Sequence, residues 1–379
     1  MIYKNFKGQK LSALGMGAMR LPVVDGNDGK IDEAAAKEMV ALAMKGGVNY
    51  YDTAWGYHSG QSELVMGRLL KEYPRESFYL ATKFPGYDLG NMDKVEKIFE
   101  EQLKKCQMDY FDFYLFHNVC EMNIDAYLDE SYGICRYLMA QKKAGRIRHL
   151  GFSAHGSCAV MKRFLEAYGK DMEFCQIQLN YLDWTFQDAK AKVELLREWG
   201  IPVWVMEPLR GGQLASKIPA EEAAALTALR PQEKIPALAF RFLQTIPEVV
   251  VTLSGMSSLS QLEENLATYA QEKPLTSAEW SAVLEVADRI VRPNSVPCTA
   301  CRYCTSHCPQ GLDIPELLAL YNEHRVTGGG FIAPMALMAY PEEKKPSACI
   351  ACRSCEAVCP QQIKISETLA DFGKRLAAG

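Results

Sequence analysis

The sequence predicts an α/β protein that contains a (β/α)8 barrel with an N-terminal β-hairpin, followed by a small C-terminal α+β domain. The barrel is predicted because eight short apolar runs alternate with helical segments, a pattern typical of parallel βαβ units. Polar residues also follow several of these runs, as expected where the ends of barrel strands meet. A cysteine-rich repeat then marks a change of composition. We therefore expect a barrel over residues 1–292 and a second domain over residues 293–379.

The chain of 379 residues is long enough for both parts, since such barrels need about 250 residues. Residues 2–14 are expected to form a hairpin that turns at Lys7-Gly8 and covers the barrel bottom. Strands are expected near 14–19, 48–51, 78–82, 111–116, 148–152, 174–179, 202–206 and 248–252. Helices are expected after Asp32 and near 61–72, 92–106, 125–144, 157–168, 187–199, 258–270, 275–291 and 314–324. An open nucleotide-binding sheet is less favoured, because Gly15-x-Gly17 lacks the third glycine of the dinucleotide fingerprint.

The charge balance narrows the class of partner. A formal net charge of -4, from 42 basic and 46 acidic side chains, provides no basic excess for a nucleic acid or a membrane surface. The N-terminus has no signal-like apolar segment and no stretch reaches the roughly 20 apolar residues of a membrane span, so we expect a cytoplasmic protein. Thirteen cysteines are many for that compartment, where thiol clusters more often bind metal than form disulfides.

Eight of the cysteines form two copies of the pattern Cys-x2-Cys-x2-Cys-x3-Cys-Pro. The copies contain Cys298, Cys301, Cys304 and Cys308, and then Cys349, Cys352, Cys355 and Cys359. This part, about residues 296–368, resembles bacterial two-cluster ferredoxin domains. The resemblance implies a ferredoxin-like fold with two [4Fe-4S] clusters, in which the fourth cysteine of each run binds the other cluster. One cluster would use Cys298, Cys301, Cys304 and Cys359, and the other Cys349, Cys352, Cys355 and Cys308. A pair of zinc sites is less favoured, because zinc motifs usually separate two Cys-x2-Cys pairs by a longer loop.

Four polar residues follow consecutive predicted strands of the barrel. Asp52 and Tyr57 lie in Tyr-Asp-Thr-Ala-x-x-Tyr, Lys83 in Thr-Lys, and His117 in Leu-Phe-His-Asn. Their order and flanking residues resemble the catalytic tetrad of the aldo-keto reductase family. The resemblance implies NAD(P)H-linked reduction of a small carbonyl compound, or the reverse oxidation of an alcohol, with Tyr57 as proton donor. Trp55 beside the tyrosine is a candidate pocket residue.

The residue types suit this chemistry. A tyrosine with its ordinary pKa of about 10 is a poor acid–base catalyst at neutral pH. A neighbouring Lys83 ammonium would favour the phenolate and lower that pKa, and Asp52 would keep the lysine charged and oriented. His117 would donate a hydrogen bond to the carbonyl oxygen as negative charge develops there. His58, next to Tyr57, is a further candidate for the substrate pocket.

The family resemblance extends to about residue 292 and implies a nicotinamide cofactor. Ser153 and Gln176 match positions that hold the carboxamide, and residues 207–212 match the loop that covers the pyrophosphate. The implied contacts are Met19, Arg20, Ser153, Gln176, Met206, Pro208, Leu209, Gly211, Gly255, Ser257, Gln261, Glu264 and Asn265. Ala154 replaces a usual asparagine, Met206 replaces an aromatic ring, and residues 255–262 lack a Lys or Arg for a 2′-phosphate. A preference for NADPH is therefore not favoured, and NADH, weak cofactor binding or a different electron donor all remain open.

Two functions remain in competition. The favoured one is an oxidoreductase whose clusters serve electron transfer or sensing, with a ferredoxin- or flavodoxin-like protein as a candidate redox partner. Nicotinamide transfers two electrons and each cluster one, and no flavin motif that could link them is recognisable. The alternative is a redox-responsive nucleotide-binding or electron-transfer protein in which the clusters carry the function. An intact tetrad argues against this alternative, because binding alone needs no acid–base tyrosine.

Overall fold

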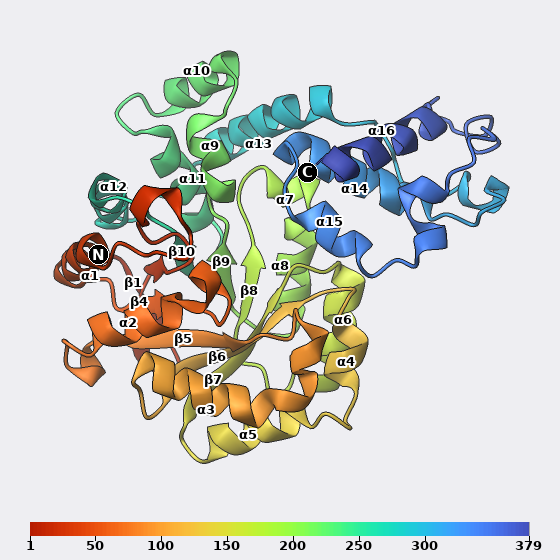
Figure 1. The fold of residues 1–379 in the computed structure, drawn as a ribbon. Coiled ribbons are helices and arrows are strands. Elements are labelled where there is room, and N and C mark those ends of the chain that lie inside the picture. Colours follow the sequence, from red (N-terminus) through yellow and green to blue (C-terminus); the bar gives the residue numbers. More distant parts are fainter. Residues whose placement is uncertain (379) are drawn as a thin grey trace. The chain divides into compact units, whose positions relative to one another are not determined.

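The computed structural model describes residues 1–378, and these divide into two compact units at Leu284/Glu285. The first unit contains a closed parallel barrel, whose strands lie at the centre of its helices in Figure 1. The strands are β3 (Leu14–Gly17), β4 (Tyr50–Asp52), β5 (Tyr79–Phe84), β6 (Phe111–Val119), β7 (Ile147–Ala154), β8 (Cys175–Gln178), β9 (Val203–Met206) and β10 (Val249–Ser254). Each strand pairs with its sequence neighbours, and β10 pairs with β3 to close the barrel. The predicted eight-stranded barrel is confirmed.

Helices connect and surround these strands. They are α1 (Glu33–Lys45), α2 (Ser62–Leu70), α3 (Val95–Cys106), α4 (Ile124–Leu128), α5 (Ile134–Lys143), α6 (Cys158–Tyr168), α7 (Asp183–Phe186), α8 (Ala189–Glu198), α9 (Gln213–Ser216), α10 (Ala220–Leu229), α11 (Ile235–Gln244), α12 (Leu259–Tyr269) and α13 (Ser277–Val291). The prediction of one helix near 125–144 is wrong, because residues 129–133 interrupt it and Gly133 has a φ of 64°. The sequence pattern also assigned no helix to residues 207–247, where α9, α10 and α11 lie. Alanines around most of α10 hide the one-sided apolar periodicity that would have indicated it.

An N-terminal hairpin closes one end of the barrel, as predicted. Its strands β1 (Tyr3–Phe6) and β2 (Gln9–Ser12) pair antiparallel. The buried Phe6 ring packs against the rings of Phe113, Phe174 and Trp204, with centroid distances of 5.8, 6.5 and 5.0 Å. These aromatic contacts fill the barrel interior at this end. Any site in the barrel must therefore open at the other end, where the strands terminate.

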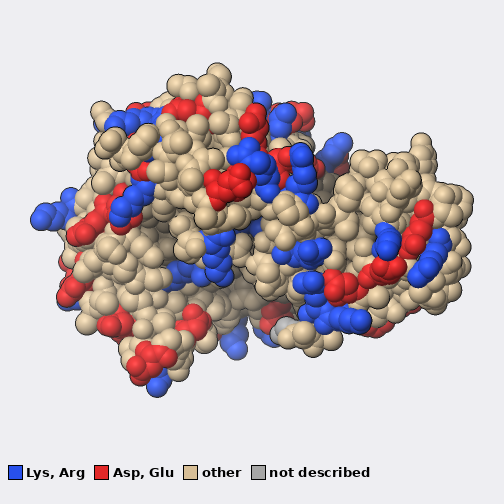
Figure 2. Space-filling view, turned by 90° about the horizontal axis from the view of Figure 1, so that it is seen from above, with Lys and Arg blue, Asp and Glu red and all other residues tan. Residues whose placement is uncertain are grey.

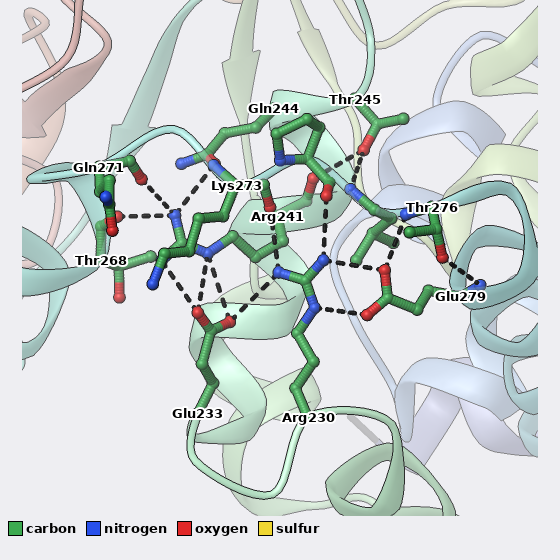
Figure 3. Close-up of polar contacts among 12 residues, drawn as sticks. Arg230, Glu233, Arg241, Gln244, Thr245, Thr268, Gln271, Lys273, Thr276 and Glu279 are labelled. Atoms are coloured by element: carbon green, nitrogen blue, oxygen red, sulfur yellow. Dashed lines mark hydrogen bonds and ion pairs between the residues drawn. The ribbon is translucent and has the colours of Figure 1, made fainter.

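A polar network joins α10, α11 and α12 to the start of α13 (Figure 3). The Arg230 guanidinium donates to both carboxylate oxygens of Glu279, at 2.7 and 2.9 Å. Glu233 lies 3.6 Å from Arg230 and 3.1 Å from Arg241. Arg241 in turn donates to the carbonyl oxygen of Thr268 in α12, at 2.8 Å. Fork-shaped arginine–carboxylate pairs of this kind fix both distance and orientation. They hold the first turn of α13 against the barrel helices.

The second unit is built around three helices, α14 (Ile314–Thr327), α15 (Ile332–Leu337) and α16 (Ile365–Ala378). No strand is assigned among its residues up to 378. Leu317, Leu318 and Phe372 form its apolar core together with the buried Cys304 and Cys355. The apolar run 331–340 contributes buried side chains to this core, as expected of a packing segment. The C-terminal α16 had not been predicted.

The surface agrees with the near balance of charges in the composition. In Figure 2, Lys and Arg side chains are interspersed with Asp and Glu on the face in view. Among the residues that the structure describes, none of the helices combines the length and the apolar character needed to cross a membrane.

Candidate active site and cluster sites

The barrel brings the four predicted catalytic residues to the ends of adjacent strands. Asp52 is the last residue of β4, Lys83 lies near the end of β5, and His117 lies near the end of β6. The parallel register places Asp52 beside Ala81, and Lys83 beside Leu115. Tyr57 lies in the turn that follows β4. The strand order therefore brings these residues to the same end of the barrel, as the sequence predicts.

Lys83 links Asp52 to Tyr57. Its Nζ lies 2.6 Å from Asp52 Oδ1, 2.9 Å from the carbonyl oxygen of Thr53 and 3.4 Å from the Tyr57 hydroxyl. Lys83 is fully buried, so its ammonium needs these partners to compensate for lost hydration. The ammonium is thus fixed directly beside the tyrosine oxygen.

The electrostatics of this group favour a charged lysine and a protonated tyrosine. Burial lowers the pKa of Lys83, but the charges of Asp52 and Tyr57 outweigh it and raise the pKa overall. Burial raises the pKa of Tyr57 above its ordinary value, and Lys83 opposes this shift without reversing it. The expectation of a lowered Tyr57 pKa is therefore wrong in direction, although Lys83 acts as predicted. The hydroxyl keeps its proton at neutral pH.

His117 is a neutral imidazole in this site. Burial, with smaller contributions from Lys83 and His155, holds its pKa well below 6.5. Its ring lies edge-on to Tyr57 and Tyr87, at centroid distances of 6.1 and 5.1 Å. Its Nδ1 is buried without a hydrogen-bond partner among the described residues. Such an imidazole can donate one hydrogen bond to a substrate oxygen without carrying charge.

Tyr87 is a neighbour of the tetrad that the sequence analysis missed. Its hydroxyl packs against Gly56, where a Cβ atom would lie only 2.4 Å away. Burial raises the Tyr87 pKa to about 12, with smaller contributions from Glu63 and from Tyr57. The sequence could have indicated Tyr87, because it lies in the loop after the strand that carries Lys83, and loops after barrel strands form the active-site face.

A buried polar network behind β5 was also missed. The Glu63 carboxylate accepts hydrogen bonds from Thr82 Oγ1 and Gln102 Nε2, both at 2.7 Å. The same Gln102 nitrogen donates to the carbonyl oxygen of Lys83 at 2.9 Å. All of these side chains are fully buried, so the network fixes the strand that carries Lys83.

The two residues beside Tyr57 have different environments. Lys105 Nζ lies 3.5 Å from the ring centroid of Trp55 and 3.7 Å from a carboxylate oxygen of Glu63. The contact with the Lys105 ammonium anchors the half-buried indole of Trp55. His58 is buried and accepts a hydrogen bond from the Leu21 N–H at 3.1 Å, while its Nδ1 lies 2.9 Å from the Asp28 carbonyl oxygen. His58 therefore ties two loops together, and the expectation that it lines the substrate pocket is not supported.

A cavity of about 290 Å³ extends from Asp52 and Tyr57. Of the predicted cofactor residues, it is lined by Met19, Arg20, Gln176, Met206, Pro208, Leu209, Gly211, Gly255, Ser257, Gln261, Glu264 and Asn265. Ser153 is the exception, since its Oγ accepts a hydrogen bond from the Asn118 N–H at 2.8 Å. Glu207, the first residue of the stretch 207–212 that is expected to cover the pyrophosphate, lines the cavity as well. One concave space thus connects Asp52 and Tyr57, though not Lys83 or His117, with the positions expected for a dinucleotide.

Each predicted set of four cysteines surrounds one cavity in the second unit. One cavity is lined by Cys298, Cys301, Cys304 and Cys359, and the other by Cys308, Cys349, Cys352 and Cys355. The fourth thiol of each run thus lies with the three thiols of the other run.

The backbone of the two cysteine loops also fits a bound cluster. Ala300 and Arg302 have positive φ values, as do their counterparts Ala351 and Arg353 in the second copy. Non-glycine residues rarely adopt positive φ values, and here four of them do so at equivalent positions of the two copies. This indicates that the loops are shaped to surround a bound cluster, and not by the backbone preferences of their own residues. Within residues 1–378, no three His, Cys, Asp or Glu side chains converge as a site for a single metal ion.

Comparison with known proteins agrees with both parts of the chain. Residues 13–288 match the family model described as aldo/keto reductase family, and residues 297–364 match a 4Fe-4S dicluster domain. L-galactose dehydrogenase from Arabidopsis thaliana is 27% identical, over 76% of this chain and 95% of the relative. NADH-specific methylglyoxal reductase from Escherichia coli is 26% identical, over 74% and 96% respectively.

Solved structures show the same fold. The holo form of aldo-keto reductase AKR11C1 from Bacillus halodurans aligns with a TM-score of 0.62 at 24% identity, covering 76% of this chain and 96% of that protein. The chain is therefore an oxidoreductase that belongs to the aldo/keto reductase family and carries a C-terminal 4Fe-4S dicluster domain.

Proposed function

We propose that this protein reduces the carbonyl group of a small molecule with NADH, or catalyses the reverse oxidation of an alcohol, with Tyr57 as the acid–base residue. The observation that carries the proposal is the position of the Lys83 ammonium, between Asp52 and the Tyr57 hydroxyl, both of which line the cavity. When bound, the nicotinamide supplies a hydride to the carbonyl carbon. The residues of the chain then have to manage the charge and the proton at the carbonyl oxygen.

Each tetrad residue has a distinct part in that task. Tyr57 donates its hydroxyl proton to the oxygen, and Lys83, 3.4 Å away, stabilises the phenolate that remains. Asp52 keeps the buried lysine charged and oriented. The neutral His117 donates a hydrogen bond to the oxygen while negative charge accumulates on it. The reverse reaction uses the same groups in the opposite order.

The lining of the cavity supports NADH rather than NADPH as the cofactor. Among the described lining residues, Arg20 has the one Lys or Arg side chain, and it lies 3.8 Å from Glu207. Glu264 lies at the expected adenosine end, where its carboxylate accepts a hydrogen bond from Lys234 at 2.6 Å and can accept further hydrogen bonds from a ribose diol. The relative described as an NADH-specific reductase points in the same direction.

For the second unit, the proposal includes two [4Fe-4S] clusters with crossed ligation. The two four-cysteine cavities support it. Such clusters exchange one electron at a time, and we propose a ferredoxin- or flavodoxin-like protein as their partner. An anaerobic titration of cluster-replete protein with NADH tests whether the two units are coupled. Reduction of the clusters by NADH, followed by visible absorbance and EPR, would show that electrons pass between the two units. Clusters that stay oxidised during carbonyl-dependent NADH oxidation would indicate that they exchange electrons with the partner protein instead.

The decisive variant for the barrel is Tyr57→Phe in the full-length, cluster-replete protein. We expect carbonyl reduction to fall by about 10²–10⁴-fold, the usual contribution of a general acid, while the Kd for NADH stays unchanged. Tyr132→Phe, at an exposed position, is the matched control. Unchanged turnover in Tyr57→Phe would exclude the catalytic assignment. Absence of NADH binding in the wild type would exclude the cofactor assignment.

A further inference from the structure

Glu207 occupies an unusual position in the cavity. It follows the last residue of β9, precedes Pro208 and has a φ of 55°, a left-handed conformation that non-glycine residues rarely adopt. Its side chain is 19% exposed and lines the same cavity as Tyr57. Strained backbone of this kind persists where the surroundings hold it, and it is common at ligand sites.

The Glu207 carboxylate is held by groups that typically hold a bound anion. The Arg20 guanidinium lies 3.8 Å from it, and the Gly211 backbone N–H lies close enough to lower its pKa. Gly211 and Gly212 have φ values of 63° and 88°, and the Gly212 N–H donates to the Leu209 carbonyl oxygen at 2.9 Å, which fixes this turn beside the carboxylate. An arginine guanidinium is a typical phosphate-binding group. Here a side chain of the protein itself fills the place of the anion.

Arg20 reaches across this part of the cavity. A Cβ atom on Gly211 would lie 3.0 Å from its Nη2, and one on Gly255 would lie 3.1 Å from its aliphatic stem. The Ser257 hydroxyl donates to the backbone oxygen of Arg20 at 2.8 Å. Arg20, in the loop after β3, therefore contacts the loops after β9 and β10, and the Arg20–Glu207 pair lines the same cavity as Tyr57 and Glu264.

Several charges face the Glu207 carboxylate. Burial raises the pKa of Glu207; Arg20, the Gly211 amide and Arg210 oppose that rise, while Asp183 adds to it. The charge of Glu207 also contributes to the raised pKa of Tyr57. The net effect is a carboxylate that is protonated more easily than an exposed one. Its negative charge is therefore less stable in the cavity than in water.

We propose that Glu207 is a specificity-determining residue, an internal anion that occupies the pyrophosphate position of the cavity and competes with the dinucleotide for Arg20 and the Gly211 amide. This inference rests on the proposed nicotinamide function of the barrel. A pyrophosphate entering this position must displace the carboxylate or accept its repulsion, so the wild type binds dinucleotides weakly. A ligand with an additional phosphate is disfavoured further.

The experiment measures the Kd of NADH and of inorganic pyrophosphate for full-length, cluster-replete protein under anaerobic conditions. Glu207→Gln removes the charge and keeps the shape, whereas Glu207→Asp keeps the charge. We expect Glu207→Gln to bind both probes on the order of tenfold more tightly at pH 8, the equivalent of one pKa unit of interaction, and Glu207→Asp to resemble the wild type. Glu166→Gln, at an exposed site on α6, is the control for loss of a distant charge.

A second measurement needs no variant. The wild type should bind both probes more tightly as the pH falls from 8 towards the raised pKa of Glu207, because protonation of Glu207 removes the competing charge, and Glu207→Gln should show a weaker dependence. Equal or weaker binding by Glu207→Gln, with no tightening of wild-type binding at low pH, would overturn the inference and leave the proposed function intact. If neither protein binds NADH, the inference and the proposed cofactor both fail.

Discussion

The Nζ of Lys83 lies 2.6 Å from Oδ1 of Asp52, and both side chains are buried at the end of the barrel. The second Asp52 oxygen, Oδ2, has no hydrogen-bond partner among the described residues. The aspartate thus directs one oxygen at the ammonium, and the lysine contacts the Tyr57 hydroxyl in addition. A buried pair arranged in this way orients the lysine more than it stabilises the fold, because desolvation offsets most of its attraction.

This pair predicts separate effects on stability and activity. Asp52→Asn and Lys83→Met should each destabilise the barrel by about 3–5 kcal/mol, because each leaves a buried charge without its partner. The double variant should be more stable than the sum of the two losses implies, yet remain inactive in carbonyl reduction. Chemical unfolding and steady-state kinetics of all four proteins test this. Additive losses of stability would contradict a direct ion pair.

The pH dependence of turnover follows from the environments of Tyr57 and His117. Reduction requires protonated Tyr57, whose pKa is raised by burial, so kcat should stay flat near neutral pH and fall only above about pH 10. The His117 pKa lies well below 6.5, also because of burial, so titration of this residue should not change kcat near neutral pH. A pH profile of kcat for the reductive reaction measures both. A limb near pH 6.5 that disappears in His117→Gln would contradict a neutral imidazole.

Much of this site could be predicted from the sequence because its signals are local. Asp52, Lys83 and His117 each follow an apolar run, and parallel strands bring such positions together. The cysteine spacing is equally local. The contact between Glu63 and Gln102 could not be predicted, because it joins two helices and depends on how they pack. Ser153 illustrates the same limit, since the register of β7 against β6 directs its Oγ to the Asn118 amide.

The crossed cluster ligation can be tested by pairs of substitutions. If Cys359 belongs with Cys298, the double variant Cys298→Ser/Cys359→Ser should lose one cluster and retain about four irons per chain. Cys298→Ser/Cys308→Ser should lose both clusters. Iron analysis and EPR of anaerobically reconstituted protein distinguish the two variants. The reverse result would mean that each cluster uses the four cysteines of a single run.

The Arg230–Glu279 pair at the start of α13 predicts a pH-dependent contribution to stability. A hydrogen bond from Arg230 lowers the Glu279 pKa to about 2, against an ordinary value near 4.5. Because the folded pKa is the lower one, the stabilisation is present above pH 4.5 and is lost as the pH falls towards 2. Glu279→Gln should therefore reduce the free energy of unfolding by about 1–3 kcal/mol at pH 7 and by less at pH 3.

An exposed pair provides the control for this prediction. Lys162 and Glu166 on α6 are 3.9 Å apart, and both side chains are mostly exposed. Glu166→Gln should change the free energy of unfolding by less than about 1 kcal/mol at either pH. Denaturant titrations followed by circular dichroism would measure both variants. An equal loss for Glu279→Gln at pH 7 and pH 3 would show that the charge of Glu279 is not the cause.

Isotope transfer can be followed from NADH deuterated at both C4 positions of the nicotinamide, with a small aldehyde as acceptor and cluster-replete protein under anaerobic conditions. We expect deuterium on the former carbonyl carbon of the alcohol product in the wild type. We also expect little product in Tyr57→Phe, although that variant still binds NADH. Unlabelled alcohol formed by the wild type, or labelled alcohol formed at an undiminished rate by Tyr57→Phe, would contradict hydride transfer with Tyr57 as the proton donor.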